Sequence, residues 1–108
     1  MEVEVKNMPV QALRVLLKRR DAPTVFDVRT AEERTIASID GAELLDRARV
    51  QGLLEGPKDT RLIFICHTGN RSLATATYFA RRGFTDVWNV EGGIDAWSQK
   101  IDPSVPRY

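Results

Sequence analysis

The sequence predicts an α/β domain with a central, mostly parallel sheet of about five strands and helices on both faces. Short runs rich in β-branched and other apolar residues alternate with segments whose apolar residues recur at helical spacing. This alternation is typical of domains in which helices connect parallel strands. The chain has 108 residues, the length of one compact domain, so we expect a single domain over residues 1–108.

The first predicted element is a short edge strand at residues 3–6, where apolar and charged residues alternate. Pro9 then suits the first turn of a helix, because it has no backbone N–H to leave unpaired there. Basic residues 18–20 close this helix, where cations complement the helix dipole. Its apolar face comprises Val10, Leu13, Leu16 and Leu17.

The remaining elements follow in regular alternation. Thr30 is placed to cap a short helix that follows the strand at 24–28. A Gly-Pro pair ends the helix that follows the weaker strand at 42–45. The predicted strands are 24–28, 42–45, 61–65 and 86–90, and the predicted helices after Thr30 cover about 46–54, 73–82 and 94–100. The prolines of the tail predict irregular structure there.

Charge and cysteine content exclude several classes of protein. With 16 basic and 15 acidic residues the formal net charge is +1, which argues against a nucleic-acid or membrane-surface partner. The longest apolar run, residues 62–66, is far shorter than the roughly 20 residues of a membrane helix. The acidic start lacks the features of a signal peptide. A single cysteine forms no internal disulfide and no cysteine-rich metal site, so we expect no metal and a reducing, cytoplasmic location.

The predicted chemistry centres on Cys66, which follows the clearest strand and precedes a polar loop and a helix. Ligands of open α/β sheets bind at the carboxyl ends of strands. The start of a helix offers unpaired N–H groups and a positive dipole end, which favour an anion and should lower the thiol pKa of Cys66. A lone cysteine after an apolar strand is more often a buried packing residue, but the loop behind it reverses that expectation.

The loop itself supplies the groups that an anion needs. Arg71 adds a permanent positive charge and a fork of donors suited to oxyanions. Gly69 permits a backbone twist that strains other residues. The remaining polar members, which hold the loop or donate hydrogen bonds inward, are Thr68, Asn70 and Ser72.

Four stretches, in order, resemble the motifs of single-domain rhodaneses. Residues 66–72, Cys-His-Thr-Gly-Asn-Arg-Ser, resemble the active-site loop of that family. The other three resemble its Asp-Val-Arg strand end with a following glutamate, its Ile-x-Gly-Ala segment and its Gly-Gly-x-x-x-Trp segment; they are residues 26–29 with Glu32 or Glu33, 39–42 and 90–97. The sequence departs from the family at Ala37-Ser38, where Gly-His is usual, and at Arg34, where an aromatic is usual.

The resemblance implies a rhodanese-like fold and a sulfurtransferase in which Cys66 carries a sulfane sulfur as a persulfide. Thiosulfate would be the small anionic donor, a thiol or cyanide the acceptor, and residues His67 to Ser72 the substrate-binding loop, with no cofactor. A protein is a possible sulfur acceptor. Four residues separate Cys66 from Arg71. Cysteine phosphatases have a loop one residue longer, so the spacing favours sulfur over phosphate.

Two other functions remain open. The persulfide could belong to a sulfur-relay or regulatory module loaded by a protein partner, and a phosphatase or arsenate reductase on the same scaffold is less favoured. The sequence identifies neither the physiological donor and acceptor nor the oligomeric state, nor does it tell whether the chain is part of a larger multidomain protein.

Several residues near the loop invite a catalytic role. His67 lies beside the nucleophile, but a thiolate activated by the loop needs no general base, so we place His67 at the pocket rim. Asp27 and Arg29 end a strand expected next to the cysteine strand. We expect Asp27 to orient the loop by accepting hydrogen bonds and Arg29 to form a structural ion pair, both outside direct catalysis. Trp88 and Trp97 are expected to be packing residues.

Overall fold

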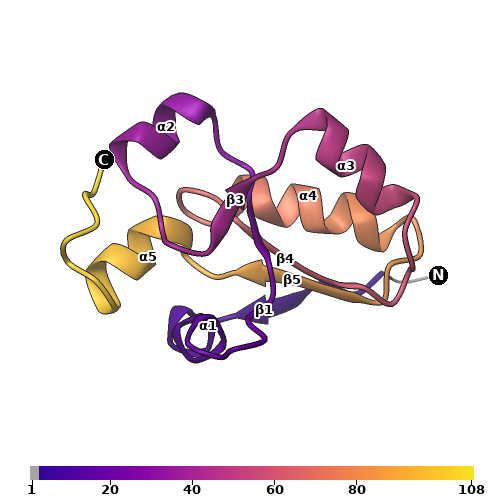
Figure 1. Cartoon of the computed structure of the whole chain (residues 1–108), viewed down its shortest axis with the longest axis horizontal. Coiled ribbons are helices and arrows are strands. Elements are labelled where there is room, and N and C mark those ends of the chain that lie inside the picture. Colours follow the sequence, from indigo (N-terminus) through magenta and orange to yellow (C-terminus); the bar gives the residue numbers. More distant parts are fainter. Residues whose placement is uncertain (1–2) are drawn as a thin grey trace.

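The computed structural model describes residues 3–108, which form a five-stranded sheet and five helices (Figure 1). The strand order is β1-β5-β4-β2-β3, and every neighbouring pair is parallel. The strands are β1 (Lys6–Met8), β2 (Val25–Asp27), β3 (Ala42–Leu44), β4 (Arg61–Ile65) and β5 (Asp86–Val90). The helices are α1 (Val10–Leu17), α2 (Ala31–Ile36), α3 (Arg47–Leu54), α4 (Asn70–Ala80) and α5 (Gly93–Lys100). The predicted α/β architecture is confirmed.

Helices cover both faces of the sheet, as predicted. Figure 1 shows α1 and α5 on one side of the sheet and α3 and α4 on the other. In the central strand β4, Ile63 and Ile65 pack in the core that includes α1 and α5, while Leu62 and Phe64 pack in the core that includes α4. Strand β4 is buried from Leu62 onward, so Cys66, which directly follows the strand, is also buried.

The edge strand β1 lies further along the chain than the sequence predicted. The prediction placed it at residues 3–6, whereas the structure has it at Lys6–Met8, paired with β5 in the register Lys6 to Trp88 and Met8 to Val90. In that register Glu4 would lie opposite Asp86, and two carboxylates facing each other are unfavourable. Lys6 instead forms an ion pair with Asp86 at 3.5 Å.

Helix α4 begins earlier than predicted. The sequence analysis placed its start at Leu73, but the helix runs from Asn70, so Arg71 and Ser72 belong to its first turn. The reason is Gly69, which takes the N-cap position with φ of 102°, a left-handed conformation that favours glycine. The polar loop is therefore only four residues long, from Cys66 to Gly69, before helical geometry starts.

The predicted cap at Thr30 is confirmed. Its side chain accepts a hydrogen bond from the N–H of Glu33 at 3.2 Å, and the Glu33 carboxylate accepts one from the N–H of Thr30 at 3.4 Å. This reciprocal capping box orients Glu33 at the start of α2.

Within residues 3–108 no helix combines the length and apolar composition that crossing a membrane requires.

Candidate active site

The backbone of the Cys66 loop is held by the first turn of α5. The carbonyl oxygen of Cys66 accepts a hydrogen bond from the N–H of Ile94 at 2.9 Å, and that of His67 accepts one from the N–H of Asp95 at 3.0 Å. A Cβ on Gly93 would collide with both carbonyl groups, so only glycine allows this approach. The glycine pair of the Gly-Gly-x-x-x-Trp segment therefore supports the Cys66 loop.

The sulfur of Cys66 lies among hydrogen-bond donors. The N–H of Gly69 donates to Sγ at 3.1 Å, and the hydroxyl of Ser72 lies 3.2 Å from the same atom. Gly69 precedes α4 and Ser72 lies in its first turn, so both donors come from the start of one helix. Cys66 is only 1% exposed.

Asn89 on β5 completes this arrangement. Its Oδ1 lies 2.5 Å from the Ser72 hydroxyl, and its Nδ2 donates to the carbonyl oxygen of Gly69 at 3.2 Å. The sequence analysis did not single out Asn89. The available signal was an amide in the middle of an apolar strand, and such a residue must find hydrogen-bond partners once it is buried.

The balance of these contacts favours the thiolate. Burial raises the pKa of Cys66, but hydrogen bonds from the Ser72 side chain and from the backbone of Ser72, Gly69 and Thr68 lower it further than burial raises it. The net direction is a pKa below that of a free thiol. This is the direction expected for a cysteine at the start of a helix.

Arg71 contacts Glu33 in the folded chain. Its Nη1 and Nη2 donate to Oε1 and Oε2 of Glu33 at 2.7 and 2.9 Å, a two-pronged pair between α4 and α2. These two hydrogen bonds hold the pKa of Glu33 well below its usual range, with burial opposing and Tyr108 assisting. Glu33 is therefore a charged member of the site, which the sequence analysis had noted only as part of a family motif.

Tyr108 joins the same group of residues. Its hydroxyl donates to Oε2 of Glu33 at 2.6 Å and accepts a hydrogen bond from Nη1 of Arg29 at 2.8 Å. Its ring stacks on the imidazole of His67, with centroids 4.0 Å apart and planes 8° from parallel. No periodic pattern marks the segment after α5, so sequence reasoning had no means of finding this contact.

Asp27 and Arg29 form a fully buried ion pair. Nη2 and Nε of Arg29 donate to the Asp27 carboxylate at 2.7 and 3.0 Å, and Nη1 of Arg34 joins it at 3.1 Å. Within residues 3–108, the side chains that donate to Asp27 are those of these two arginines, and no side chain of the Cys66 loop does so. Arg29 reaches the loop indirectly, through Tyr108.

The family model of the rhodanese-like domain matches residues 10–100. The chain belongs to the rhodanese-like domain family. The four motifs that suggested this family all lie on or within the matched residues, and the resemblance is confirmed.

Relatives of this rhodanese-like domain include proteins of similar and of much greater length. The thiosulfate sulfurtransferase GlpE of Pseudomonas putida is 34% identical over 90 residues, which are 82% of this chain and 80% of that protein. The rhodanese-like/PpiC domain-containing protein 12 of Arabidopsis thaliana is 32% identical over 114 residues, and the match covers 96% of this chain but 38% of that protein. The crystal structure of a rhodanese-like domain protein from Staphylococcus aureus matches with a TM-score of 0.72 at 30% identity, covering 86% of this chain and 91% of that one.

The predicted site residues of the rhodanese-like loop fall into two groups. Cys66, Gly69 and Ser72 converge on the sulfur, and the backbone of Thr68 contributes there. The side chains of Thr68 and Asn70 are exposed, Arg71 turns to Glu33, and His67 lies against Tyr108. Among the described residues, no group of three or more His, Cys, Asp or Glu side chains is placed to hold a metal ion.

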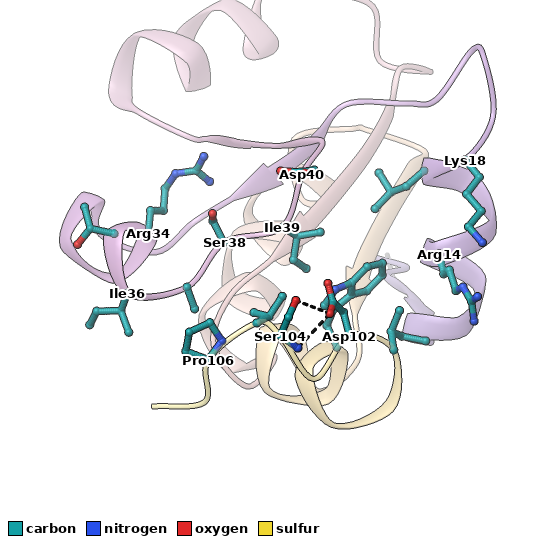
Figure 2. Close-up of a pocket in the computed structure, with 16 residues that line it drawn as sticks. Arg14, Lys18, Arg34, Ile36, Ser38, Ile39, Asp40, Asp102, Ser104 and Pro106 are labelled. Carbon is teal, nitrogen blue, oxygen red and sulfur yellow. Dashed lines mark hydrogen bonds between the residues drawn. The ribbon is translucent and has the colours of Figure 1, made fainter.

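A separate cleft of about 720 Å³ lies between α1, the segment after α2, α5 and the segment after it (Figure 2). Figure 2 shows Arg14 of α1 and Lys18, which directly follows that helix, on one side and Arg34 on the other, with Asp102 and Ser104 hydrogen-bonded below. No residue of the Cys66 loop lines this cleft. The rhodanese-like loop and this cleft are thus different places on the domain.

Proposed function

We propose that this domain is a sulfurtransferase in which Cys66 carries a sulfane sulfur as a persulfide, taken from thiosulfate or another persulfide donor. The observation that supports the proposal is the convergence of the Gly69 N–H and the Ser72 hydroxyl on Sγ. Such donors stabilise the attacking thiolate, and they can equally stabilise the negative terminal sulfur of a persulfide. The thiosulfate sulfurtransferase GlpE among the relatives gives further support.

The proposed reaction has two steps. The Cys66 thiolate attacks the outer sulfur of thiosulfate, the sulfur–sulfur bond breaks, and its electron pair leaves with sulfite. Cys66 then carries an anionic terminal sulfur. An acceptor such as cyanide attacks that sulfur and leaves as thiocyanate, which restores the thiolate. Neither step needs a proton or an electron from another group, so the chemistry resides on the cysteine. A reducing, cytoplasmic location would keep the thiol of Cys66 free of disulfide bonds.

The proposal is tested by the intact mass of the protein after incubation with thiosulfate. We expect the mass of one added sulfur atom on the wild type, its removal by cyanide, and stoichiometric thiocyanate. Cys66→Ser keeps a small polar side chain at the same place and should show none of these. Thiocyanate formation by Cys66→Ser, or a wild type that gains no sulfur from thiosulfate or from an organic persulfide, would refute the proposal.

A second candidate is a sulfur-relay or regulatory module loaded by a protein partner. The observation in its favour is that this chain spans 38% of the Arabidopsis relative, so related domains occur within longer proteins. Loading by a protein persulfide but not by thiosulfate or small persulfides would favour this candidate. A phosphatase is less favoured, because four residues separate Cys66 from Arg71, one fewer than in cysteine phosphatases.

A further inference from the structure

We propose that Glu33 is a specificity-determining residue of the Cys66 site, which disfavours anionic sulfur donors and favours persulfides that carry an uncharged or cationic group. This inference rests on the proposed function and refines it by naming the donor class. Thiosulfate would remain a donor, but a slow one compared with an organic persulfide of low negative charge.

Arg71, the cation at the end of the loop, is already paired with a carboxylate. Both terminal nitrogens of Arg71 donate to Glu33, at 2.7 and 2.9 Å. A dianion that approaches Cys66 must either displace this carboxylate or bind to a guanidinium whose charge is largely compensated. Arg71 still interacts electrostatically with the Cys66 sulfur, so a change in its compensation is felt there.

Arg29 and Arg34 are also engaged by other groups. Arg29 is fully buried against Asp27, and Arg34 divides its donors between Asp27 and the carbonyl oxygen of Ala42. Neither is free to replace Arg71 as a partner for an incoming anion. Near His67 the carboxylate of Asp95 is likewise paired with Arg107, at 3.0 Å, so the Arg71–Glu33 pair is one of two ion pairs that set the charge at the mouth of the loop.

Glu33 is held in place from several directions. Tyr108 donates to its Oε2 at 2.6 Å, and the Thr30 cap contacts its Oε1 at 3.3 Å. The Tyr108 ring in turn lies on His67, next to the nucleophile. The carboxylate is thus held in place and is 19% exposed. On a donor that enters beside His67, it would attract an ammonium group or tolerate a neutral one.

For such a donor the chemistry balances without added reagents. The Cys66 thiolate attacks the outer sulfur of R–S–SH, the sulfur–sulfur bond breaks, and its electron pair leaves on the inner sulfur as R–S⁻. The proton of the outer sulfur stays with it, giving Cys66–S–SH. The donor R–S–SH that reaches Cys66 then carries only the charge of the group R. Glu33 discriminates between donors by this charge.

The test uses three matched persulfides that differ in charge: aminoethyl, hydroxyethyl and carboxyethyl persulfide, each compared with thiosulfate for sulfur loading of the full chain. We expect the wild type to prefer them in that order and to load slowest from thiosulfate. Glu33→Gln keeps the capping geometry but removes the charge. This variant should raise the rate of sulfur loading from thiosulfate or carboxyethyl persulfide, relative to loading from aminoethyl persulfide, by about 3- to 10-fold. Such a change is expected for one partly screened charge near the surface.

Glu32→Gln is the matched control. Glu32 is the neighbouring residue of the same helix, it is exposed, and its side chain makes no hydrogen bond among those recorded for the described residues. This variant removes the same formal charge and should leave the order of donors unchanged. An equal shift in Glu32→Gln and Glu33→Gln, or no shift in Glu33→Gln, would overturn the inference.

A measurement independent of sulfur transfer separates this inference from the proposed function. The rates of Cys66 alkylation by anionic iodoacetate and neutral iodoacetamide give a ratio that reports the charge at the mouth of the loop. Glu33→Gln should raise this ratio about 3- to 10-fold and Glu32→Gln should not. An unchanged ratio in Glu33→Gln refutes the inference even if sulfur loading occurs, and a raised ratio supports it even if no donor loads the protein.

Discussion

The hydroxyl oxygen of Ser72 lies 3.2 Å from the sulfur of Cys66, and the same oxygen lies 2.5 Å from Oδ1 of Asn89. A hydroxyl has one proton, so it donates to only one of these two atoms at a time. When Cys66 is a thiol, its S–H can donate to Ser72, which donates to Asn89. When Cys66 is a thiolate, Ser72 turns its proton toward the sulfur. Ionisation of Cys66 is therefore coupled to rotation of one hydroxyl group.

Ser72→Ala should raise the pKa of Cys66, because the thiolate loses its side-chain donor. A hydrogen bond to a charged group is worth enough that alkylation by iodoacetamide near neutral pH should slow by about tenfold. Ser98→Ala is the control, since Ser98 is also buried and donates to the carbonyl oxygen of Val105, away from the sulfur. Equal alkylation rates in Ser72→Ala and the wild type would show that the backbone N–H groups alone hold the thiolate.

The pH dependence of Cys66 follows from the same contacts. Because the folded pKa is lowered, the iodoacetamide rate should reach half its maximum below the free-thiol value of about 8.5. The wild type should also gain stability relative to Cys66→Ala as the pH rises from the folded pKa to the unfolded value, and lose that gain as the pH falls again. Urea denaturation at several pH values measures this difference in the free energy of unfolding. A midpoint at or above about 8.5 would mean that burial outweighs the donors.

Removal of Arg71 should harm the use of thiosulfate more than its replacement by lysine does. In Arg71→Ala, Glu33 is left without its cation and faces the donor as an uncompensated carboxylate. Arg71→Lys keeps a positive charge but loses the two-pronged geometry. We expect the KM for thiosulfate to rise in the order wild type, Arg71→Lys, Arg71→Ala, with both variants folded because Arg71 is exposed. Wild-type kinetics in Arg71→Ala would remove this residue from the site.

Asp27→Asn should destabilise the domain strongly. The carboxylate of Asp27 is fully buried and compensates both Arg29 and Arg34, so its loss leaves buried positive charge unpaired. Removal of one partner from a buried ion pair costs about 3–5 kcal/mol, measurable by chemical denaturation. Asp21→Asn, which disrupts an exposed pair with Arg19, should leave the denaturation midpoint unchanged. A small effect of Asp27→Asn would show that water reaches this pair.

Gly93→Ala should weaken both the fold and the site. Its Cβ would collide with the carbonyl groups of Cys66 and His67, and alanine is strained at the φ of 59°. We expect a lower melting temperature and slower alkylation of Cys66, since the loop must move to make room. Gly52→Ala, on α3 with no atom near the added Cβ, should be neutral or stabilising. Normal alkylation in a folded Gly93→Ala variant would show that the loop geometry tolerates the shift.

The sequence predicted the centre of the molecule better than its edges. Strands β4 and β5 begin and end at the predicted residues, and in both strands the residues that follow the polar first position are mostly apolar and buried. The start of α4 was misplaced because it depends on the left-handed conformation of Gly69, which the spacing of apolar residues does not reveal. The contacts of Glu33, Asn89 and Tyr108 were missed because each joins segments that are far apart in the chain.

The two hydrogen bonds from α5 to the carbonyl groups of Cys66 and His67 also limit how the loop can change during evolution. An inserted residue between Cys66 and Arg71 would have to bulge outward, or both bonds would break and α5 would lose the anchor of its first turn. Unless the added residue bulges outward, a lineage that lengthens this loop to accommodate a tetrahedral ligand must alter the start of α5 as well. The length of the loop and the Gly92–Gly93 turn should therefore vary together among proteins of this fold. The two features taken together then indicate which reaction a given sequence catalyses.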